Sequence, residues 1–456
     1  MTEQLLLTYY GDDFTGSTDS MEALALGGVR VALFLEPPQP EQLQERFAGL
    51  QAVGLAGISR SLNPIQMEAE LRPKLARLKA LGAPVCHYKT CSTFDSSPQV
   101  GSIGQATDIG YDVFQPRFVP LLVGAPALKR YMLFGNLFAT VGPETFRLDR
   151  HPTMSKHPVT PMDEADLRLH LARQTPKSMA LFDILHLAGG EAELDRHLER
   201  LLEGRPEIIF FDILDNSHLP KIGRLIWNRA VRDKDAPLFA VGSSGIEYAL
   251  TAYWQQIKQV APPAGFPAPG RVEQLIVISG SASPVTAGQI DWALARGFAG
   301  IRLDTARLAH PELGEAERIA AAQQALAALA AGQSVILYTA HGPDDPAIQT
   351  TLRRLAGLNL SAGQVAQRLG EQLGQILRWL LAETGLRRAC VAGGDTSGYT
   401  ARQLSIYALE MIAPVAPGSP LCRASSHEAR FDGLEIALKG GQVGQANFFG
   451  LIQDGA

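Results

Sequence analysis

The sequence predicts an α/β protein made of two α/β domains with mostly parallel sheets, and three observations lead to this fold class. The chain has 456 residues, which is more than one hydrophobic core usually supports. Short apolar and β-branched runs alternate with longer helical patterns, as in βα units. Residues 261–270 read APPAGFPAPG, and because proline fixes φ and removes backbone donors, this segment predicts a linker. The expected domains are therefore residues 1–260 and 271–456.

Strands and helices alternate in both predicted domains. In the first domain we expect strands at 5–10, 29–35, 52–58, 85–88, 208–212 and 238–241, and helices at 17–26, 64–81 and 191–202. In the second domain we expect strands at 275–279, 300–303, 335–338, 389–392 and 434–438, and helices at 315–331 and 362–383. Because ligands bind beyond the carboxyl ends of parallel strands, functional residues are expected in the turns that follow these strands.

Composition and charge exclude several classes of partner. Lys plus Arg number 41 and Asp plus Glu 46, a formal charge of -5, so neither nucleic acid nor an anionic membrane surface is an expected partner. No apolar run reaches the length of a membrane-spanning helix, and the N-terminus lacks the basic start of a secretion signal. The four cysteines lie too far apart for a CxxC pair, which favours reduced thiols. We expect a cytoplasmic protein, and the Ala-rich helix at 315–331 offers a face through which a homo-oligomer could form.

An acidic turn with the sequence YGDDFTGSTD follows the first predicted strand. Asp12 or Asp13 can hold a sugar hydroxyl and accept its proton as the oxygen attacks phosphorus. Gly16 lets the backbone pass close to a ligand, and Ser17 or Thr18 is expected to cap the next helix. The alternative is that both aspartates serve only as turn-forming and capping residues.

A lysine among several hydroxyls follows the strand at 85–88, in the sequence HYKTCSTFDS. Lys89, with Ser92 and Thr93 beside it, can neutralise and orient an anionic group such as a carboxylate. The alternative is a polar loop with a solvated lysine.

The second domain carries small-residue turns at the ends of its strands. Ser281 and Ser283 precede Pro284, and free backbone N–H groups at a helix start form a cradle for phosphate, although such turns also serve as plain caps. Gly393 and Gly394 allow close approach of a nucleotide.

Polar and further glycine residues accompany these turns. Asp395 with Thr396 can bind phosphate-bound Mg²⁺ or ribose hydroxyls. A further glycine turn contains Gly440 and Gly441.

Two common nucleotide motifs are absent from the sequence. There is no G-x-x-x-x-G-K-[ST] loop and no G-x-G-x-x-G fingerprint, which argues against a Walker-type NTPase and against an ordinary dinucleotide fold. Two other classes remain as alternatives to a kinase. An NAD(P)-dependent oxidoreductase would need the missing fingerprint. In a non-catalytic sugar-acid-binding protein the glycine turns would have no function.

Four motifs in the same order resemble those of the four-carbon acid sugar kinase family. They stand here as GDDFTG at 11–16, GSAS at 280–283, GGDT at 393–396 and KGG at 439–441. The resemblance implies an N-terminal domain for a small sugar acid, a C-terminal domain for ATP with Mg²⁺ on its phosphates, and an active site in the cleft between them.

The residues expected to act follow from these motifs and turns. The catalytic candidates are Asp13 and Asp12. The expected substrate-binding residues are Asp12, Thr15, Gly16, Ser17, Lys89, Ser92, Thr93, Arg147 and Arg150. The expected ATP-binding residues are Ser281, Ser283, Gly393, Gly394, Asp395, Thr396, Gly440 and Gly441, with Asp395 as the Mg²⁺ ligand.

One departure from the family pattern bears on the substrate. Where the family commonly carries K-x-D-S-T-L-R-G, this chain has Cys91 in place of the aspartate and Asp95 in place of the arginine. A carboxylate clamp made by that arginine would be lost, and Arg117, Arg147 or Arg150 could replace it. The resemblance therefore points to a branched or oxidised acid such as 3-oxo-isoapionate, with 3-oxo-tetronate or a tetronate (threonate or erythronate) as the alternative, in carbohydrate catabolism.

Overall fold

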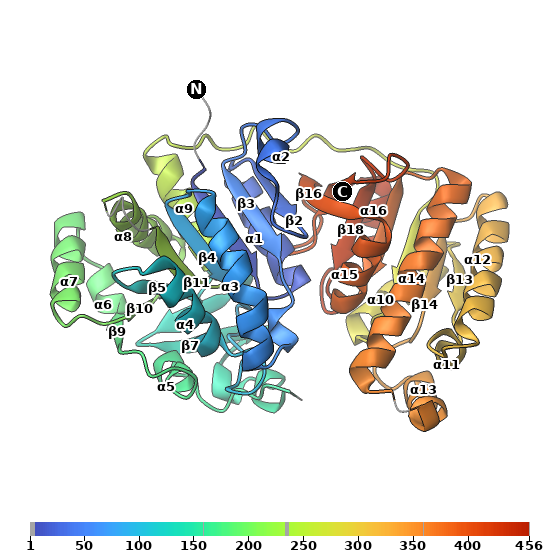
Figure 1. Ribbon diagram of the computed structural model, residues 1–456, viewed down its shortest axis with the longest axis horizontal. Helices are drawn as coiled ribbons and strands as arrows, with labels where there is room; N and C mark the ends of the chain where they lie inside the picture. The colour runs from blue at the N-terminus through green and yellow to red at the C-terminus, as the bar shows by residue number, and fades with distance from the viewer. Residues whose placement is uncertain (1–4, 158, 233–236, 359, 456) are drawn as a thin grey trace. The chain divides into compact units, whose positions relative to one another are not determined.

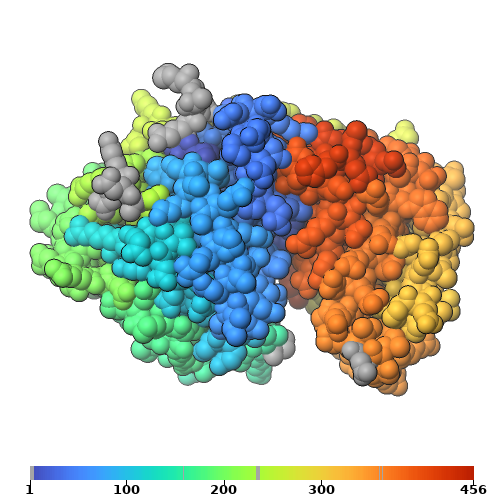
Figure 2. Space-filling view, in the orientation of Figure 1, coloured from blue at the N-terminus to red at the C-terminus, as the bar shows by residue number. Residues whose placement is uncertain are grey.

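The computed structural model describes residues 5–157, 159–232, 237–358 and 360–455. The chain divides into two compact units, residues 1–264 and 265–456. Each unit is a parallel or mostly parallel sheet covered by helices, which confirms the predicted fold class (Figure 1). In the space-filling view each unit is a continuous body of packed side chains (Figure 2).

The N-terminal unit contains an all-parallel run of strands. In spatial order these are β2 (Val31–Phe34), β3 (Ala52–Ala56), β1 (Leu7–Gly11), β4 (Val85–Lys89), β11 (Leu238–Gly242), β5 (Val119–Leu122), β10 (Ile208–Phe211) and β9 (Met179–Phe182). Six of them confirm predicted strands. The sequence predicted neither β5 nor β9, and β5 contains Pro120, a residue that weakens a strand pattern.

Helices cover both faces of this sheet. Among the described residues they are α1 (Phe14–Leu26), α2 (Pro40–Gln44), α3 (Pro64–Ala80), α4 (Ile103–Phe114), α5 (Leu167–Leu171), α6 (Ile184–Leu187), α7 (Glu191–Glu203), α8 (Leu219–Arg232) and α9 (Gly245–Gln256). The chain runs from β1 through α1 to β2 in one direction along the sheet, and from β4 through α4 to β5 in the other. The strand order therefore reverses between β1 and β4, and ligands of open α/β sheets bind at such a reversal.

A small antiparallel sheet lies apart from the main one in the N-terminal unit. Its strands are β6 (Arg130–Leu133), β7 (Asn136–Val141) and β8 (Glu144–Arg147). The carboxylate of Asp212, just after β10, accepts hydrogen bonds from the backbone N–H groups of Phe134 (2.5 Å) and Gly135 (2.9 Å) in the β6–β7 turn. This carboxylate fixes the sheet against the end of β10.

The C-terminal unit has a sheet of seven strands among the described residues. In spatial order these are β13 (Ala299–Arg302), β14 (Val335–Tyr338), β12 (Ile276–Ser279), β15 (Arg388–Ala392), β18 (Glu435–Lys439), β17 (Leu421–Ser426) and β16 (Ile406–Ala413). The first five are parallel and confirm the predicted strands. The antiparallel addition of β17 and β16 was not predicted.

The helices of the C-terminal unit define a second reversal of strand order. They are α10 (Pro284–Leu294), α11 (Thr305–Leu308), α12 (Gly314–Ala330), α13 (Pro346–Leu355), α14 (Ala362–Thr384), α15 (Gly394–Gln403) and α16 (Phe448–Asp454). The core holds Val277 of β12, Ile290 of α10 and Phe449 of α16, all fully buried. The chain leaves β12 through α10 toward β13 and leaves β15 through α15 toward β16, so the reversal lies between β12 and β15. Across the described residues, none of the helices is both long enough and apolar enough to span a membrane.

Candidate active site

Asp12 lies at the reversal between β1 and β4. Its backbone N–H donates to the carbonyl of Lys89 (2.9 Å), which fixes the turn after β1 against the end of β4. The side chain is 5% exposed, and within the described part of the chain its Oδ1 has no hydrogen-bond partner. Burial, opposed in part by the charge of Arg60, raises the pKa of Asp12 to about 7. A buried carboxyl with a free oxygen and this pKa is suited to proton transfer near neutral pH.

Asp13 is held by two donors. Its Oδ1 accepts a hydrogen bond from the backbone N–H of Gly16 (2.5 Å), and its Oδ2 forms an ion pair with Nη1 of Arg60 (2.7 Å). Asp13 is therefore the N-cap of α1, and the expectation that Ser17 or Thr18 would cap this helix is wrong. The carboxylate takes this role because it reaches the free N–H groups of the first turn. The predicted capping alternative describes Asp13 but not Asp12.

The remaining residues of this turn lie inside α1. The hydroxyl of Ser17 donates to the carbonyl of Asp13 (2.6 Å), and that of Thr18 donates to the carbonyl of half-buried Thr15 (2.8 Å). A Cβ on Gly16 would lie 2.7 Å from Oδ1 of Asp13 and would crowd the acidic turn. Gly16 therefore keeps space open beside the carboxylates.

Lys89 places a buried positive charge beside the aspartates. It is 2% exposed, and its Nζ lies 3.2 Å from Oδ2 of Asp19 on α1. Burial acts to lower its pKa, but the carboxylates of Asp19 and Asp12 outweigh this effect and the pKa of Lys89 is raised. Lys89 is therefore a fixed cation, and the solvated-lysine alternative does not describe it.

The loop after β4 is ordered around Asp95. Thr93 donates from its hydroxyl to Oδ1 of Asp95 (2.5 Å), and the hydroxyl of Thr160 donates to Oδ2 (3.2 Å). Arg60 reaches the same carboxylate with Nη2 at 3.0 Å. Burial opposes ionisation, but Arg60 and Thr93 outweigh it and lower the pKa of Asp95. Ser92 is half-buried in this loop.

Arg60 is a residue of this site that the sequence did not reveal. It follows β3 in the short 3₁₀ helix Ser59–Ser61 and joins Asp13 and Asp95. The available signal was positional: β3 pairs with β1 in parallel, so its carboxyl end reaches the same edge of the sheet. A lone arginine after a strand gives no local pattern by which it could be singled out.

The arginines predicted to hold a carboxylate lie elsewhere. Arg147 binds Asp149 through Nε and Nη2, both at 2.7 Å, and Arg150 is exposed with Nε 3.6 Å from the same residue. Arg117 is also exposed. Another arginine, Arg130 at the start of β6, was not predicted from the sequence; it is half-buried, and within the described residues its buried Nε has no partner.

The predicted nucleotide residues converge at the reversal between β12 and β15. A cavity of about 250 Å³ is lined by Gly280, Ser281, Thr339, Ala366, Leu369, Leu373, Gly393, Gly394, Asp395, Thr396 and Gly441. Gly393 has a φ of 128°, which strongly favours glycine, and a Cβ on Gly280 would collide with Oγ1 of Thr396. The small residues therefore shape the cavity.

The turn after β18 closes against the first turn of α10. Ser283 is the N-cap of α10, and its hydroxyl and that of Thr286 (2.9 Å) both donate to the carbonyl of Gly441. Gly440 precedes this carbonyl in the turn. Lys439 is fully buried, and its Nζ donates to Oγ1 of Thr286 (3.1 Å). Burial lowers the pKa of Lys439 to about 8.

The donor set limits how a metal ion can be held. Across the described residues, no group of three or more His, Cys, Asp or Glu side chains is placed to hold an ion. The carboxylate of Asp395 is exposed in the first turn of α15 and lines the cavity. Mg²⁺ in kinases is bound mainly by phosphate oxygens and water, with one or two carboxylates, so a single aspartate here fits that ion.

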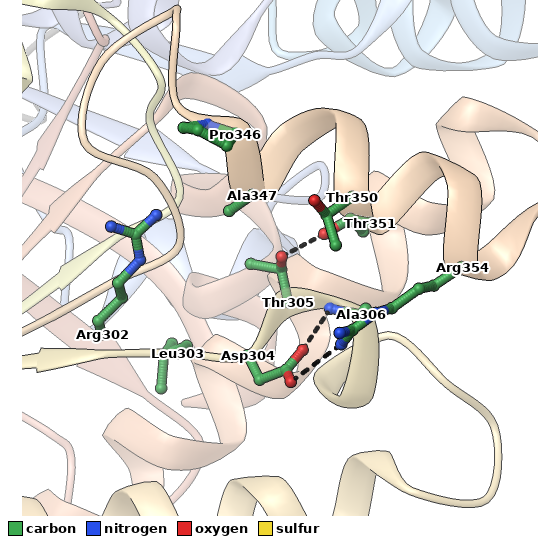
Figure 3. A pocket seen from close by; sticks show the side chains of 10 residues that line it. All are labelled: Arg302, Leu303, Asp304, Thr305, Ala306, Pro346, Ala347, Thr350, Thr351 and Arg354. Atoms are coloured by element: carbon green, nitrogen blue, oxygen red, sulfur yellow. Dashed lines mark hydrogen bonds and ion pairs between the residues drawn. The ribbon is translucent and has the colours of Figure 1, made fainter.

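A second pocket of about 380 Å³ lies at the end of β13 (Figure 3). Its two arginines are each paired with an aspartate: Arg302 with Asp345, and Arg354 with Asp304 at 3.4 Å. None of the predicted site residues lines it. Because the charges in this pocket are balanced internally, we expect it to bind a polyphosphate less well than the glycine-lined cavity does.

Comparison with known proteins identifies both units. Residues 7–250 match the model of a sugar-binding N-terminal domain, and residues 276–449 match that of a nucleotide-binding C-terminal domain. The chain belongs to the four-carbon acid sugar kinase family. It is 48% identical, over 99% of this chain and 94% of the relative, to 3-oxo-isoapionate kinase of Paraburkholderia graminis. It is 31% identical, over 99% of both chains, to 3-oxo-tetronate kinase of Methylobacterium radiotolerans.

Two solved structures share the fold of this chain. A protein of Salmonella typhimurium LT2, provisionally assigned as a tRNA synthase, superposes with a TM-score of 0.75 at 27% identity and covers 98% of each chain. A Haemophilus influenzae protein superposes with a TM-score of 0.73 at 23% identity, over 98% of this chain and 99% of its own, which shows the fold alone. The two family models and the sequence relatives confirm the predicted family membership.

Proposed function

We propose that the protein transfers the γ-phosphoryl group of ATP to a hydroxyl of a branched 3-oxo sugar acid of the 3-oxo-isoapionate type. The observation that carries this proposal is the 48% identity to 3-oxo-isoapionate kinase over 99% of the chain. In this proposal residues 1–260 bind the sugar acid and residues 271–456 bind ATP. 3-Oxo-tetronate is the second candidate, because several relatives with that activity match nearly the whole chain at about 30% identity.

Asp12 is the general base of the proposed reaction. The substrate hydroxyl oxygen forms a bond to the γ-phosphorus as the bond from phosphorus to the bridging oxygen of ADP breaks. The hydroxyl proton passes to Oδ1 of Asp12, the oxygen without a partner in the described residues. Asp13 orients the substrate rather than taking the proton, because both of its oxygens already accept from donors.

Lys89 and Arg130 are the proposed partners of the substrate carboxylate. Lys89 is a buried cation next to Asp12, and the hydroxyls of Ser92 and Thr93 supply further polar contacts. Gly16 leaves space for the substrate beside them. Within the described residues the buried Nε of Arg130 has no partner, while its Nη1 donates to the backbone carbonyls of Leu128 and Lys129. An arginine fork matches a carboxylate in shape and charge, which makes Arg130 the better candidate for direct contact.

The glycine turns of the C-terminal unit are the proposed ATP site. Backbone N–H groups at the starts of α10 and α15 attract phosphate, and the glycines allow it to approach. Ser281, Ser283 and Thr396 add hydroxyls, and Gly440 and Gly441 close the turn beside them. Mg²⁺ bound to the phosphates next to Asp395 would offset the charge that develops during transfer.

ADP release over a panel of acids tests the proposal. We expect ATP-dependent turnover with 3-oxo-isoapionate at a kcat/KM at least about tenfold above that with 3-oxo-tetronate, and little turnover with threonate or erythronate. A higher kcat/KM with 3-oxo-tetronate would identify that acid, the second candidate, as the substrate. No turnover with any acid, together with a melting temperature raised by NAD and not by ATP, would contradict a kinase.

A further inference from the structure

Arg60 is attached by its backbone to the turn that carries the acidic pair. Its N–H donates to the carbonyl of Asp12 (3.0 Å). The residues just before it are also fixed, because the N–H of Ile58 donates to the hydroxyl of Tyr10 (3.2 Å) and the hydroxyl of Ser59 lies 2.8 Å from that of Tyr88. Arg60 therefore starts from a backbone that has little freedom to move relative to Asp12.

The guanidinium group of Arg60 divides three neighbouring carboxylates into two classes. Nη1 binds Asp13 at 2.7 Å and Nη2 binds Asp95 at 3.0 Å. Each of these carboxylates also accepts from other donors, the Gly16 N–H for Asp13 and the Thr93 and Thr160 hydroxyls for Asp95. Both oxygens of Asp13 and both oxygens of Asp95 therefore already accept from a donor. Of these three carboxylates, only that of Asp12 keeps a buried oxygen without a partner in the described residues.

We propose that Arg60 is the positioning residue of this site: by holding Asp13 and Asp95 as its charged partners, it leaves Asp12 as the one carboxylate able to take the substrate proton. This inference rests on the proposed kinase function. Without the guanidinium, three carboxylates would face Lys89, which is already shared with Asp19. Repulsion among them would favour the protonated form of Asp12 and remove the base at neutral pH.

A purely structural salt bridge is the alternative, and the pH profile separates the two. The titratable and charged groups that face Asp12 from the surrounding elements are Asp13, Arg60, Tyr88, Lys89 and Asp95, and Asp19 in turn faces Lys89. A structural role would lower the melting temperature without moving the acid limb of kcat/KM. A positioning role moves that limb, because the limb reports the ionisation of Asp12.

The test compares Arg60→Gln and Arg60→Lys with Arg77→Gln, a control at an exposed position of α3. Arg60→Gln should move the acid limb upward by about one unit or more, because removing a nearby opposite charge favours the neutral carboxyl. Arg60→Lys should keep the limb close to its wild-type position, because the charge remains. Its kcat should still fall about tenfold or more, because one ammonium cannot span two carboxylates as a fork does. Arg77→Gln should match wild type.

A second readout keeps the inference testable without turnover. A ¹³C NMR titration of the carboxyl carbons, with Asp12 assigned by its loss in Asp12→Asn, should show the Asp12 midpoint shifted upward in Arg60→Gln. If wild-type protein released no ADP with any acid, the proposed function would fail while this titration still decided the role of Arg60. An acid limb and an Asp12 midpoint that both stay at their wild-type positions in Arg60→Gln would overturn the inference.

Discussion

The two reversals of strand order carry opposite kinds of chemistry. At the end of β1 and β4 the site is made of charged side chains: Arg60 pairs with Asp13, and the backbone of Asp12 is hydrogen-bonded to the backbones of Lys89 and Arg60. At the end of β12 and β15 the cavity is lined mainly by glycine, serine and threonine, and Asp395 is its only charged lining residue among the described residues. In the proposed function, the same sheet geometry supports proton transfer through side chains in one unit and polyphosphate binding through the backbone in the other.

The largest expected effect is the loss of the base at the charged site. Asp12→Asn should lower kcat about 10²- to 10⁴-fold, the usual range for removal of a general base. In the wild-type protein kcat/KM should fall as the pH drops through about 7, because Asp12 must be ionised to accept a proton. Steady-state ADP release across a pH series measures both.

Asp13→Asn is the matched control, because asparagine also caps helices. It should reduce kcat less than Asp12→Asn does and should leave a measurable acid limb. A larger loss in Asp13→Asn than in Asp12→Asn would assign the base to Asp13.

The next effect concerns the small-residue site. A Cβ on Gly441 would lie 2.7 Å from Oγ of Ser281, so Gly441→Ala should raise the KM for ATP about tenfold or more, equivalent to about 1.4 kcal/mol of binding. Gly288→Ala in α10 is the control, because a Cβ there meets nothing within 4 Å. Equal KM values for ATP in the two variants would argue against phosphate binding at this turn.

A comparison of two arginines sharpens the assignment of the carboxylate site. Arg130→Gln should raise the KM for the sugar acid about tenfold, because a carboxylate loses its fork of donors. Arg147→Gln should raise it less than about threefold, since Arg147 is exposed and bound to Asp149. The reverse order would support the interpretation made from the sequence, in which Arg147 contacts the substrate.

A separate effect, on stability rather than on turnover, concerns Lys439 near the glycine turns. Lys439 has a folded-state pKa of about 8 against an ordinary value of 10.5, so the folded state binds its proton more weakly than the unfolded state. The stability contribution is present above about pH 10.5 and is lost as the pH falls through about 8. Lys439→Met should therefore stabilise the protein at pH 7 by about 3 kcal/mol, at 1.36 kcal/mol per pKa unit.

Melting curves from pH 7 to 11 measure this effect, and the difference between Lys439→Met and wild type should shrink as the pH rises. A constant difference across that range would mean that packing around Thr286 and Phe448, rather than charge, sets it.

Much of the fold was predictable because strand ends and glycine turns leave local patterns. The motifs around Asp12, Ser281 and Gly393 are contiguous, and each follows a β-branched or apolar run. Arg60 and Thr160 enter the acidic site from distant segments, so only tertiary packing reveals them. The sequence assigned the wrong capping residue to α1, because several residues in the turn can accept a hydrogen bond from a backbone N–H. Only the geometry of the folded turn selects Asp13.

Amide hydrogen exchange with each ligand alone tests most directly whether the two sites have these separate tasks. ADP with Mg²⁺ should slow exchange at 280–283, 393–397 and 439–444, and the sugar acid should slow it at 11–17 and 89–95. Protection of 11–17 and 89–95 by ADP, with none at the glycine turns, would contradict the assignment of the nucleotide to the C-terminal unit.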